Sequence, residues 1–174
     1  MTWRLLLAGF LGLCAALYEV GAVSFLPPWF QLRPLLPFIV LLLVSSSRSR
    51  AFAAALGGAI VLDAYTLDHF SLALVRLPLM VVILDVIASR FLTNRSVYAT
   101  AALAVFARLF DWIVSWLFAL AAVFLNIHDG MWIIPPAPGF VLVWDVVVTS
   151  FLFFLIAGLT GRFQTRPGSS YASR

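Results

Sequence analysis

The chain has 174 residues, of which 64% are hydrophobic and only 10% are charged, and its mean hydropathy is +1.09. A soluble globular domain carries about 25% charged residues, and a soluble fold of this size could not bury so much apolar surface. The composition therefore excludes an ordinary soluble domain and predicts a protein embedded in a lipid bilayer. The net charge of +4 comes from arginines scattered between apolar runs. This pattern lacks the basic stripe of a nucleic-acid-binding protein and argues against that function.

Apolar runs long enough to cross a membrane follow one another along the chain, since a crossing needs about 20 mainly apolar residues. The first covers residues 3–26, and its length favours a retained span over a cleaved signal segment. The stretch "SSSRSR" divides the next region into two shorter spans at about 29–44 and 51–65, both near or below the usual length for a full crossing. Three further runs cover 70–91, 97–125 and 139–160.

These runs predict an all-α fold: a polytopic membrane protein with six transmembrane helices in a single domain over residues 1–162. The polar segment 163–174 is expected to be a disordered tail. With six alternating crossings, eight arginines fall on one side of the membrane, and only Arg33 falls in the loops of the other. Because cytoplasmic loops carry the excess of arginine, both termini are expected to be cytoplasmic.

Seven charged residues lie inside the predicted spans: Glu19, Asp63, Arg76, Asp85, Arg108, Asp111 and Asp145. Charges in lipid cost about 2.5 kcal/mol or more near a helix centre, so they normally face protein or trapped water. Glu19, Asp63, Arg76 and Asp145 all lie six or seven residues from the outer end of their spans, or roughly 9–10 Å deep at 1.5 Å per residue. We therefore expect one ionic layer shared by several helices.

Two pairings are predicted within these charges. Asp63 and Arg76 flank a tight connection between two spans, so an antiparallel hairpin would bring them to equal depth. Asp85 should not serve Arg76, because nine residues place it on the opposite face of the helix. Arg108 and Asp111 are neighbours by their i, i+3 spacing, and their face must point inward or towards another polypeptide.

The predicted layer contains three acids and one arginine, which leaves an excess of negative charge. Either Arg108 joins the network, a carboxylate is protonated, or an outside group completes it. The candidate partner or ligand site therefore comprises Glu19, Asp63, Arg76, Arg108, Asp111 and Asp145. The alternative is purely structural, because buried ion pairs can fix helix register without any activity.

Small residues recur every four positions and let membrane helices approach closely. The residues predicted to have this role are Ala8, Gly12, Ala16, Ala54 and Gly58. Internal packing is the favoured interpretation, and the alternative makes the first stripe a docking face for another subunit. No nucleophile–base pair, phosphate-binding loop or metal-ligand motif is present, so neither an enzyme nor a cofactor is expected. His69 and His128, each beside an aspartate, are interpreted as loop residues rather than metal ligands.

Residues 33–87 contain "RPLLPFIVLLLV", a short basic turn, then "AALGGAIVLDAY" and "TLDHFSLALV". This order of a proline-started span, a glycine-rich span closing on an aspartate and a short turn resembles the rod shape-determining protein MreD family. Asp63 falls on the aspartate of that family. The resemblance implies a fold similar to the substrate-binding S-components of energy-coupling-factor transporters. It also implies a non-enzymatic role in the bacterial inner membrane, binding MreC and supporting the cell-wall elongation machinery.

Two functional hypotheses follow. The preferred one is a scaffold of the MreD type that presents a helix face to a single-span partner such as MreC. The alternative is a vitamin-binding S-component, whose ligand would lie in an outward-open cavity lined by the embedded charges. A closed ionic layer would favour the scaffold, whereas an open polar cavity large enough for a small ligand would favour the transporter subunit. A third, weaker hypothesis is a membrane protein with structural duties only.

Overall fold

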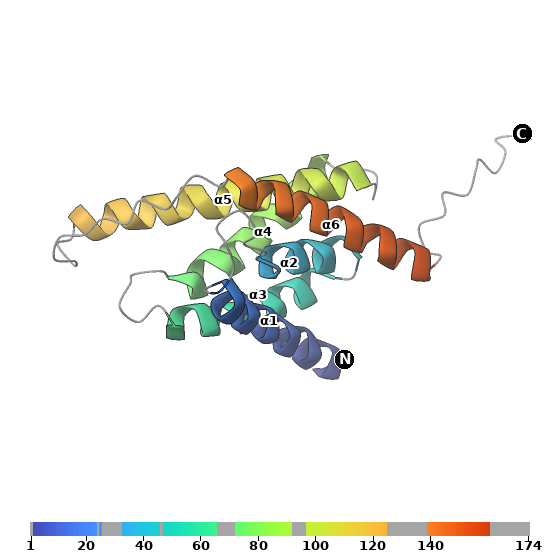
Figure 1. Ribbon diagram of the computed structural model, residues 1–174, viewed down its shortest axis with the longest axis horizontal. Helices are drawn as coiled ribbons and strands as arrows, with labels where there is room; N and C mark the ends of the chain where they lie inside the picture. The colour runs from blue at the N-terminus through green and yellow to red at the C-terminus, as the bar shows by residue number, and fades with distance from the viewer. Residues whose placement is uncertain are drawn as a thin grey trace, which may run out of the picture.

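The computed structural model describes residues 2–23, 25, 33–45, 47–65, 72–91, 97–124 and 139–160. The predicted tail at 163–174 and both histidines, His69 and His128, lie outside these described residues. The described part of the chain is all-helical, as its composition predicts. It forms α1 (Thr2–Val23), α2 (Leu35–Ser45), α3 (Arg48–Tyr65), α4 (Ala73–Phe91), α5 (Val97–Phe124) and α6 (Gly139–Thr160) (Figure 1).

Three of these helices have the length and composition of membrane spans: Thr2–Gly21 within α1, Val97–Phe118 within α5 and Gly139–Ile156 within α6. The other three helices differ from a simple span. Helix α2 has 11 residues, about 16 Å at 1.5 Å per residue, which is roughly half the hydrocarbon core. Helices α3 and α4 are longer, but each carries three charged residues.

Helix α2 begins later than the sequence pattern predicts. Residues 33 and 34, which fall inside the predicted span at 29–44, are not helical. The reason is Pro34, whose ring disfavours a helical conformation at the preceding residue, Arg33. Helix formation starts immediately after Pro34, whose carbonyl accepts a hydrogen bond from the Phe38 N–H at 3.0 Å. Pro37 is tolerated in this first turn because its missing N–H would have no intrahelical partner there.

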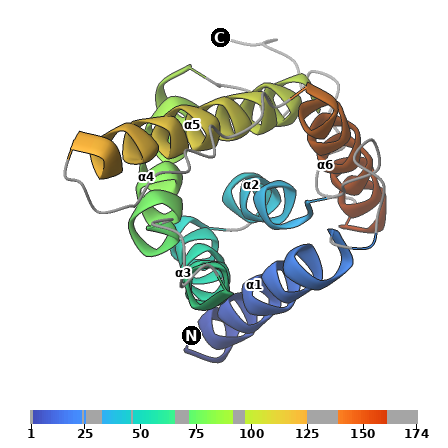
Figure 2. The same cartoon turned by 60° about the vertical axis from the view of Figure 1, so that its left-hand side comes forward.

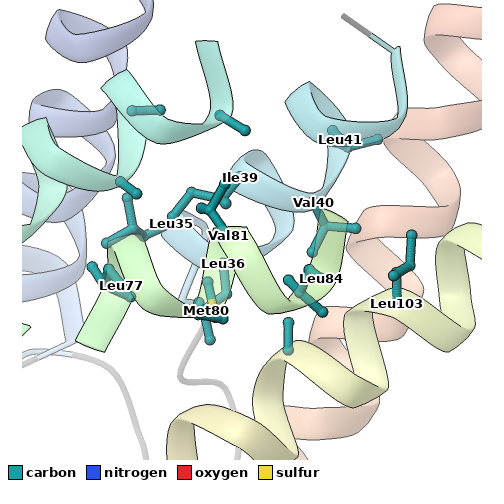
Figure 3. Packing of buried hydrophobic residues seen from close by; sticks show 14 of the residues in the cluster. Leu35, Leu36, Ile39, Val40, Leu41, Leu77, Met80, Val81, Leu84 and Leu103 are labelled. Atoms are coloured by element: carbon teal, nitrogen blue, oxygen red, sulfur yellow. The ribbon is translucent and has the colours of Figure 1, made fainter. Parts of the chain in front are cut away.

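Helix α2 lies in the centre of the bundle, surrounded by the other five helices (Figure 2). Its composition explains this position, because it is apolar on every side and has no polar face to give to water. Its Leu36, Ile39 and Val40 side chains lie next to Met80 and Leu84 of α4 (Figure 3). All five of these side chains are buried in one hydrophobic core.

Helices α3 and α4 form the antiparallel hairpin that the short connection predicts. At one end, Arg48 of α3 contacts Asp85 of α4, with 3.4 Å between Nη1 and Oδ2. At the other end, the Asp63 carboxylate accepts hydrogen bonds from the backbone N–H groups of Ala73 and Leu74. Both ends of the hairpin are therefore joined by side-chain contacts.

Helices α1 and α3 approach so closely that only glycine fits at the contact. A Cβ added at Gly12 would lie 2.8 Å from the Cα of Ala54, and one added at Gly57 would lie 3.2 Å from the Cα of Gly9. Gly58 faces α2 instead, because a Cβ there would lie 2.6 Å from Cδ1 of Leu35. The small residues of α3 thus face two different helices.

The outward surface of the bundle is strongly apolar. Large hydrophobic side chains are exposed along α1, α5 and α6, among them Trp3, Phe10, Ile113, Phe151 and Phe154. The C-terminal end of α5 reaches beyond the neighbouring helices (Figure 1), and Phe124 at this end is exposed. Such extensive exposed apolar surface is typical of a face that contacts lipid or another membrane helix.

Candidate functional site

The most deeply buried charges of the described residues form an ion pair between α5 and α6. The Nε–H of Arg108 donates to Oδ2 of Asp145 at 2.5 Å. Arg108 is 5% exposed and Asp145 is 2% exposed, so neither side chain reaches the outer surface of the bundle. A charge-assisted hydrogen bond in a low-dielectric interior is strong and directional. This pair therefore fixes how α6 is rotated and positioned against α5.

Asp111 connects this pair to α4. One of its carboxylate oxygens lies 3.7 Å from Nη1 of Arg108, as the i, i+3 spacing predicts. The other lies 2.9 Å from Nε of Arg76 on α4. The Nη1 of Arg76 also donates to the Ser115 hydroxyl at 2.5 Å, and that hydroxyl donates to the Asp111 carbonyl at 2.6 Å. A continuous chain of polar contacts thus joins α4, α5 and α6.

Glu19 adds α1 to the same electrostatic cluster. Its carboxylate lies 3.9 Å from Nε of Arg33, just before α2, and its side chain is 15% exposed. Glu19 also interacts electrostatically with Arg108, Asp111 and Asp145. Glu19 lies four residues before the end of α1. Its contact with Arg33 therefore places the start of the α2 segment beside the last turns of α1.

We use the term ionic cluster for six residues in two sets of contacts. One set is the pair of Glu19 and Arg33, and the other is the chain of contacts through Arg76, Asp111, Arg108 and Asp145. The cluster contains three arginines and three acids, so its formal charges balance. The excess of negative charge predicted from the sequence is therefore absent from this cluster, because Arg108 and Arg33 join it. The formal charges of this cluster therefore need no ligand or partner to balance them.

Asp63 has a different role from the one the hairpin predicts. Its two carboxylate oxygens accept the backbone N–H groups of Ala73 and Leu74 at 2.7 and 2.8 Å. These are the first two N–H groups of α4, which have no partner inside their own helix. Leu72, immediately before them, has a φ of 41°. Asp63 therefore caps α4 from the end of α3, and its pairing with Arg76 stays a prediction.

Two residues of the site were not predicted from the sequence. Ser115 lies four residues after Asp111 and shares its helix face, which is a signal that the i, i+4 rule could have provided. The apolar pattern places Arg33 in an outer loop, although it is the one arginine on that side and the nearest available partner for an outer acid. Asp85, expected to lie away from Arg76, contacts Arg48.

The small residues predicted to pack helices lie inside the bundle. Ala8 and Ala16 of α1 are buried, and Gly12 between them faces the backbone of Ala54. The stripe on α1 is therefore covered by α3 of the same chain. A second subunit could not use it in this conformation.

A comparison of the chain with protein-family models, with curated proteins and with solved structures finds no match. Function must therefore be inferred from the chemistry of the described residues. Within them, the ionic cluster has balanced formal charges, and each of its charged side chains lies within 4 Å of a group of opposite charge. Its central pair, Arg108 and Asp145, is almost fully buried between α5 and α6, which suits the fixing of helix positions.

Proposed function

We propose that this chain is a non-enzymatic scaffold of the bacterial inner membrane, similar in role to MreD proteins. On this proposal all six helices lie within the bilayer, and both termini face the cytoplasm. The protein binds a single-span partner of the MreC kind and supports the cell-wall elongation machinery that maintains rod shape. Lipid covers the remaining apolar surface, and neither a cofactor nor a nucleic acid is involved.

The observation that carries the proposal is the buried, charge-balanced pair of Arg108 and Asp145 within the ionic cluster. Arg108 and Asp145 are almost fully buried, and each contacts a group of opposite charge. Buried ion pairs of this kind give a helix bundle one defined arrangement, since any slip leaves a charge without a partner. A protein whose task is to present a fixed surface to another membrane helix requires such rigidity.

The segment that resembles MreD has a structural role in the described residues. Three residues of α3 each face a different neighbouring helix: Gly57 faces α1, Gly58 faces α2 and Asp63 caps α4. The glycines and the aspartate of this segment therefore organise the bundle. This supports a scaffold, because the family-like residues are used for packing rather than for contact with a small molecule.

The proposal is tested by co-purification from bacterial membranes in a mild detergent. The tagged chain is co-expressed with an MreC-type protein, and both are quantified after affinity capture. Recovery of the MreC-type protein in a fixed ratio supports the proposal. Recovery of the coupling ATPases of a vitamin transporter, with no MreC-type protein, would overturn it in favour of the S-component alternative.

Matched variants make this test specific. Asp145→Asn removes the charge of the buried pair, and we expect it to reduce capture of the partner at least several-fold, because the helix arrangement is no longer fixed. Arg48→Gln removes the half-exposed pair with Asp85 and should leave capture unchanged. Equal loss in both variants would show that the buried cluster has no particular role in presenting the binding surface.

A further inference from the structure

The buried polar atoms without a hydrogen-bond partner among the described residues include Nη2 of Arg108 on α5 and the hydroxyl of Thr149 on α6, the two helices that the Arg108–Asp145 pair joins. The Nε of Arg108 donates a hydrogen bond to Asp145, and its Nη1 faces the Asp111 carboxylate. Only Nη2 is left without an acceptor. Thr149 is 0% exposed. A buried threonine in a helix usually bonds the carbonyl four residues earlier, and here it does not.

The two groups lie around the same carboxylate. Thr149 follows Asp145 by four residues on α6, so both side chains are on one face of the helix, about one turn apart. In a guanidinium the N–H bonds of Nε and Nη2 point from the same edge, which is the edge that Arg108 turns towards Asp145. Nη2 therefore points from the edge that faces Asp145, and Thr149 lies one helical turn from Asp145 on the same face of α6.

We propose that this point holds an internal water-binding site between α5 and α6. The water accepts hydrogen bonds from Nη2 of Arg108 and from the Thr149 hydroxyl. It donates one hydrogen to the carboxylate of Asp145. Buried water typically makes about three hydrogen bonds to otherwise unsatisfied polar groups, which is the number available here.

The balance of charge selects water over an ion. The ionic cluster has three arginines and three acids, so a bound anion or cation would leave a net charge inside the bundle, where charge is costly. A neutral molecule that both accepts and donates satisfies the two groups without that cost. The site is independent of the proposed partner, and its occupancy is tested on the isolated protein.

The direct test is a crystal structure of the full chain in a lipidic mesophase, at a resolution that shows ordered water. We expect a density peak within about 2.7–3.2 Å of both Nη2 of Arg108 and Oγ1 of Thr149. The peak should vanish in Thr149→Val and persist in Thr100→Val, which changes another fully buried threonine. The proposal would be overturned by a map with no such peak, in which the Thr149 hydroxyl donates to the Asp145 carbonyl and Nη2 of Arg108 donates to a protein acceptor.

Thermal unfolding in detergent gives a second readout with opposite signs for the two outcomes. Valine has the shape of threonine without its hydroxyl. If the hydroxyl binds water, Thr149→Val removes that water and leaves Nη2 of Arg108 without an acceptor, and the melting temperature falls by about 2–4 °C. If the hydroxyl is unsatisfied in a dry site, valine removes a buried polar group and the melting temperature is unchanged or higher, which would overturn the proposal. Should the variant not fold, the density map of the unaltered protein decides.

Discussion

The contact of helix α1 with α3 and the contact of helix α6 with α5 are made by opposite means. Helix α1 meets α3 by close packing, where glycines allow the two backbones to approach. Helix α6 is joined to α5 by the buried pair of Arg108 and Asp145. We call these the glycine contact and the charge contact. The glycine contact is disrupted when a larger side chain replaces a glycine. The charge contact is disrupted when one of its two charged side chains is removed.

The proposed bilayer environment explains this difference. Lipid tails are as apolar as leucine, so burying apolar side chains between membrane helices provides little net driving force. Close packing and polar contacts must then hold the helices together. Close packing dominates between α1 and α3, and a polar contact joins α5 and α6, so the two contacts should respond independently to substitution.

The largest effect is expected at the charge contact. Asp145→Ala leaves the Arg108 guanidinium buried beside one remaining acid and should reduce the free energy of unfolding by about 3–5 kcal/mol. Chemical denaturation in detergent micelles, followed by circular dichroism, measures this loss. Asp145→Asn keeps the shape of the side chain and should reduce the free energy of unfolding by a smaller amount. A stability within error of the unaltered protein for the alanine variant would mean that the pair contributes nothing to holding α6.

A smaller but clear effect is expected at the glycine contact. Gly12→Val places a branched side chain against the backbone of Ala54, and separating α1 from α3 should cost about 1–3 kcal/mol. Gly21→Ala is the matched control on the same helix, because no atom lies within 4 Å of an added Cβ there. It should be neutral, or slightly stabilising through helix propensity. Equal destabilisation of both variants would argue against a specific contact at Gly12.

The amino-acid sequence predicts the charge contact better than the glycine contact, for physical reasons. A charge in an apolar run must find a polar neighbour, so Arg108, Asp111 and Asp145 are identifiable from their positions in the sequence alone. Which acid takes which arginine depends on how each helix is rotated, and spacing along one helix cannot determine that. The contact between Gly9 and Gly57 is not predicted, because small residues are common in membrane helices and a spacing alone does not name the partner.

Asp63 shows the same limit at a single residue. Its depth and the tight hairpin predict a pairing with Arg76, and the hairpin itself is present. The spacing could not show that the start of α4 offers two backbone N–H groups to the same carboxylate. Leu72 adopts a left-handed conformation at this point, where glycine would be the ordinary choice. Sequence patterns predict the ends of the hairpin but not the cap that joins them.

Asp63→Asn tests the cap and the predicted pairing together. Asparagine has one side-chain oxygen in place of two, so it cannot accept both backbone N–H groups as the carboxylate does. We expect the free energy of unfolding to fall by about 1 kcal/mol. Combining it with Arg76→Leu, which breaks the contact with Asp111, gives a double-mutant cycle. Losses that add within about 0.5 kcal/mol would count against a direct Asp63–Arg76 pair, and a smaller combined loss would support one.

The smallest effect should come from the pair between Arg48 and Asp85, which joins the other end of the hairpin. The Arg48 side chain is 55% exposed and lies 3.4 Å from the carboxylate. Exposed pairs contribute about 0–1 kcal/mol and weaken with salt. Arg48→Gln should therefore lower stability by no more than this amount, and any loss should shrink when the ionic strength is raised. A salt-independent loss as large as that of Asp145→Ala would mean that burial does not set the strength of ion pairs in this bundle, and the contrast between its enclosed and exposed charges would have no energetic meaning.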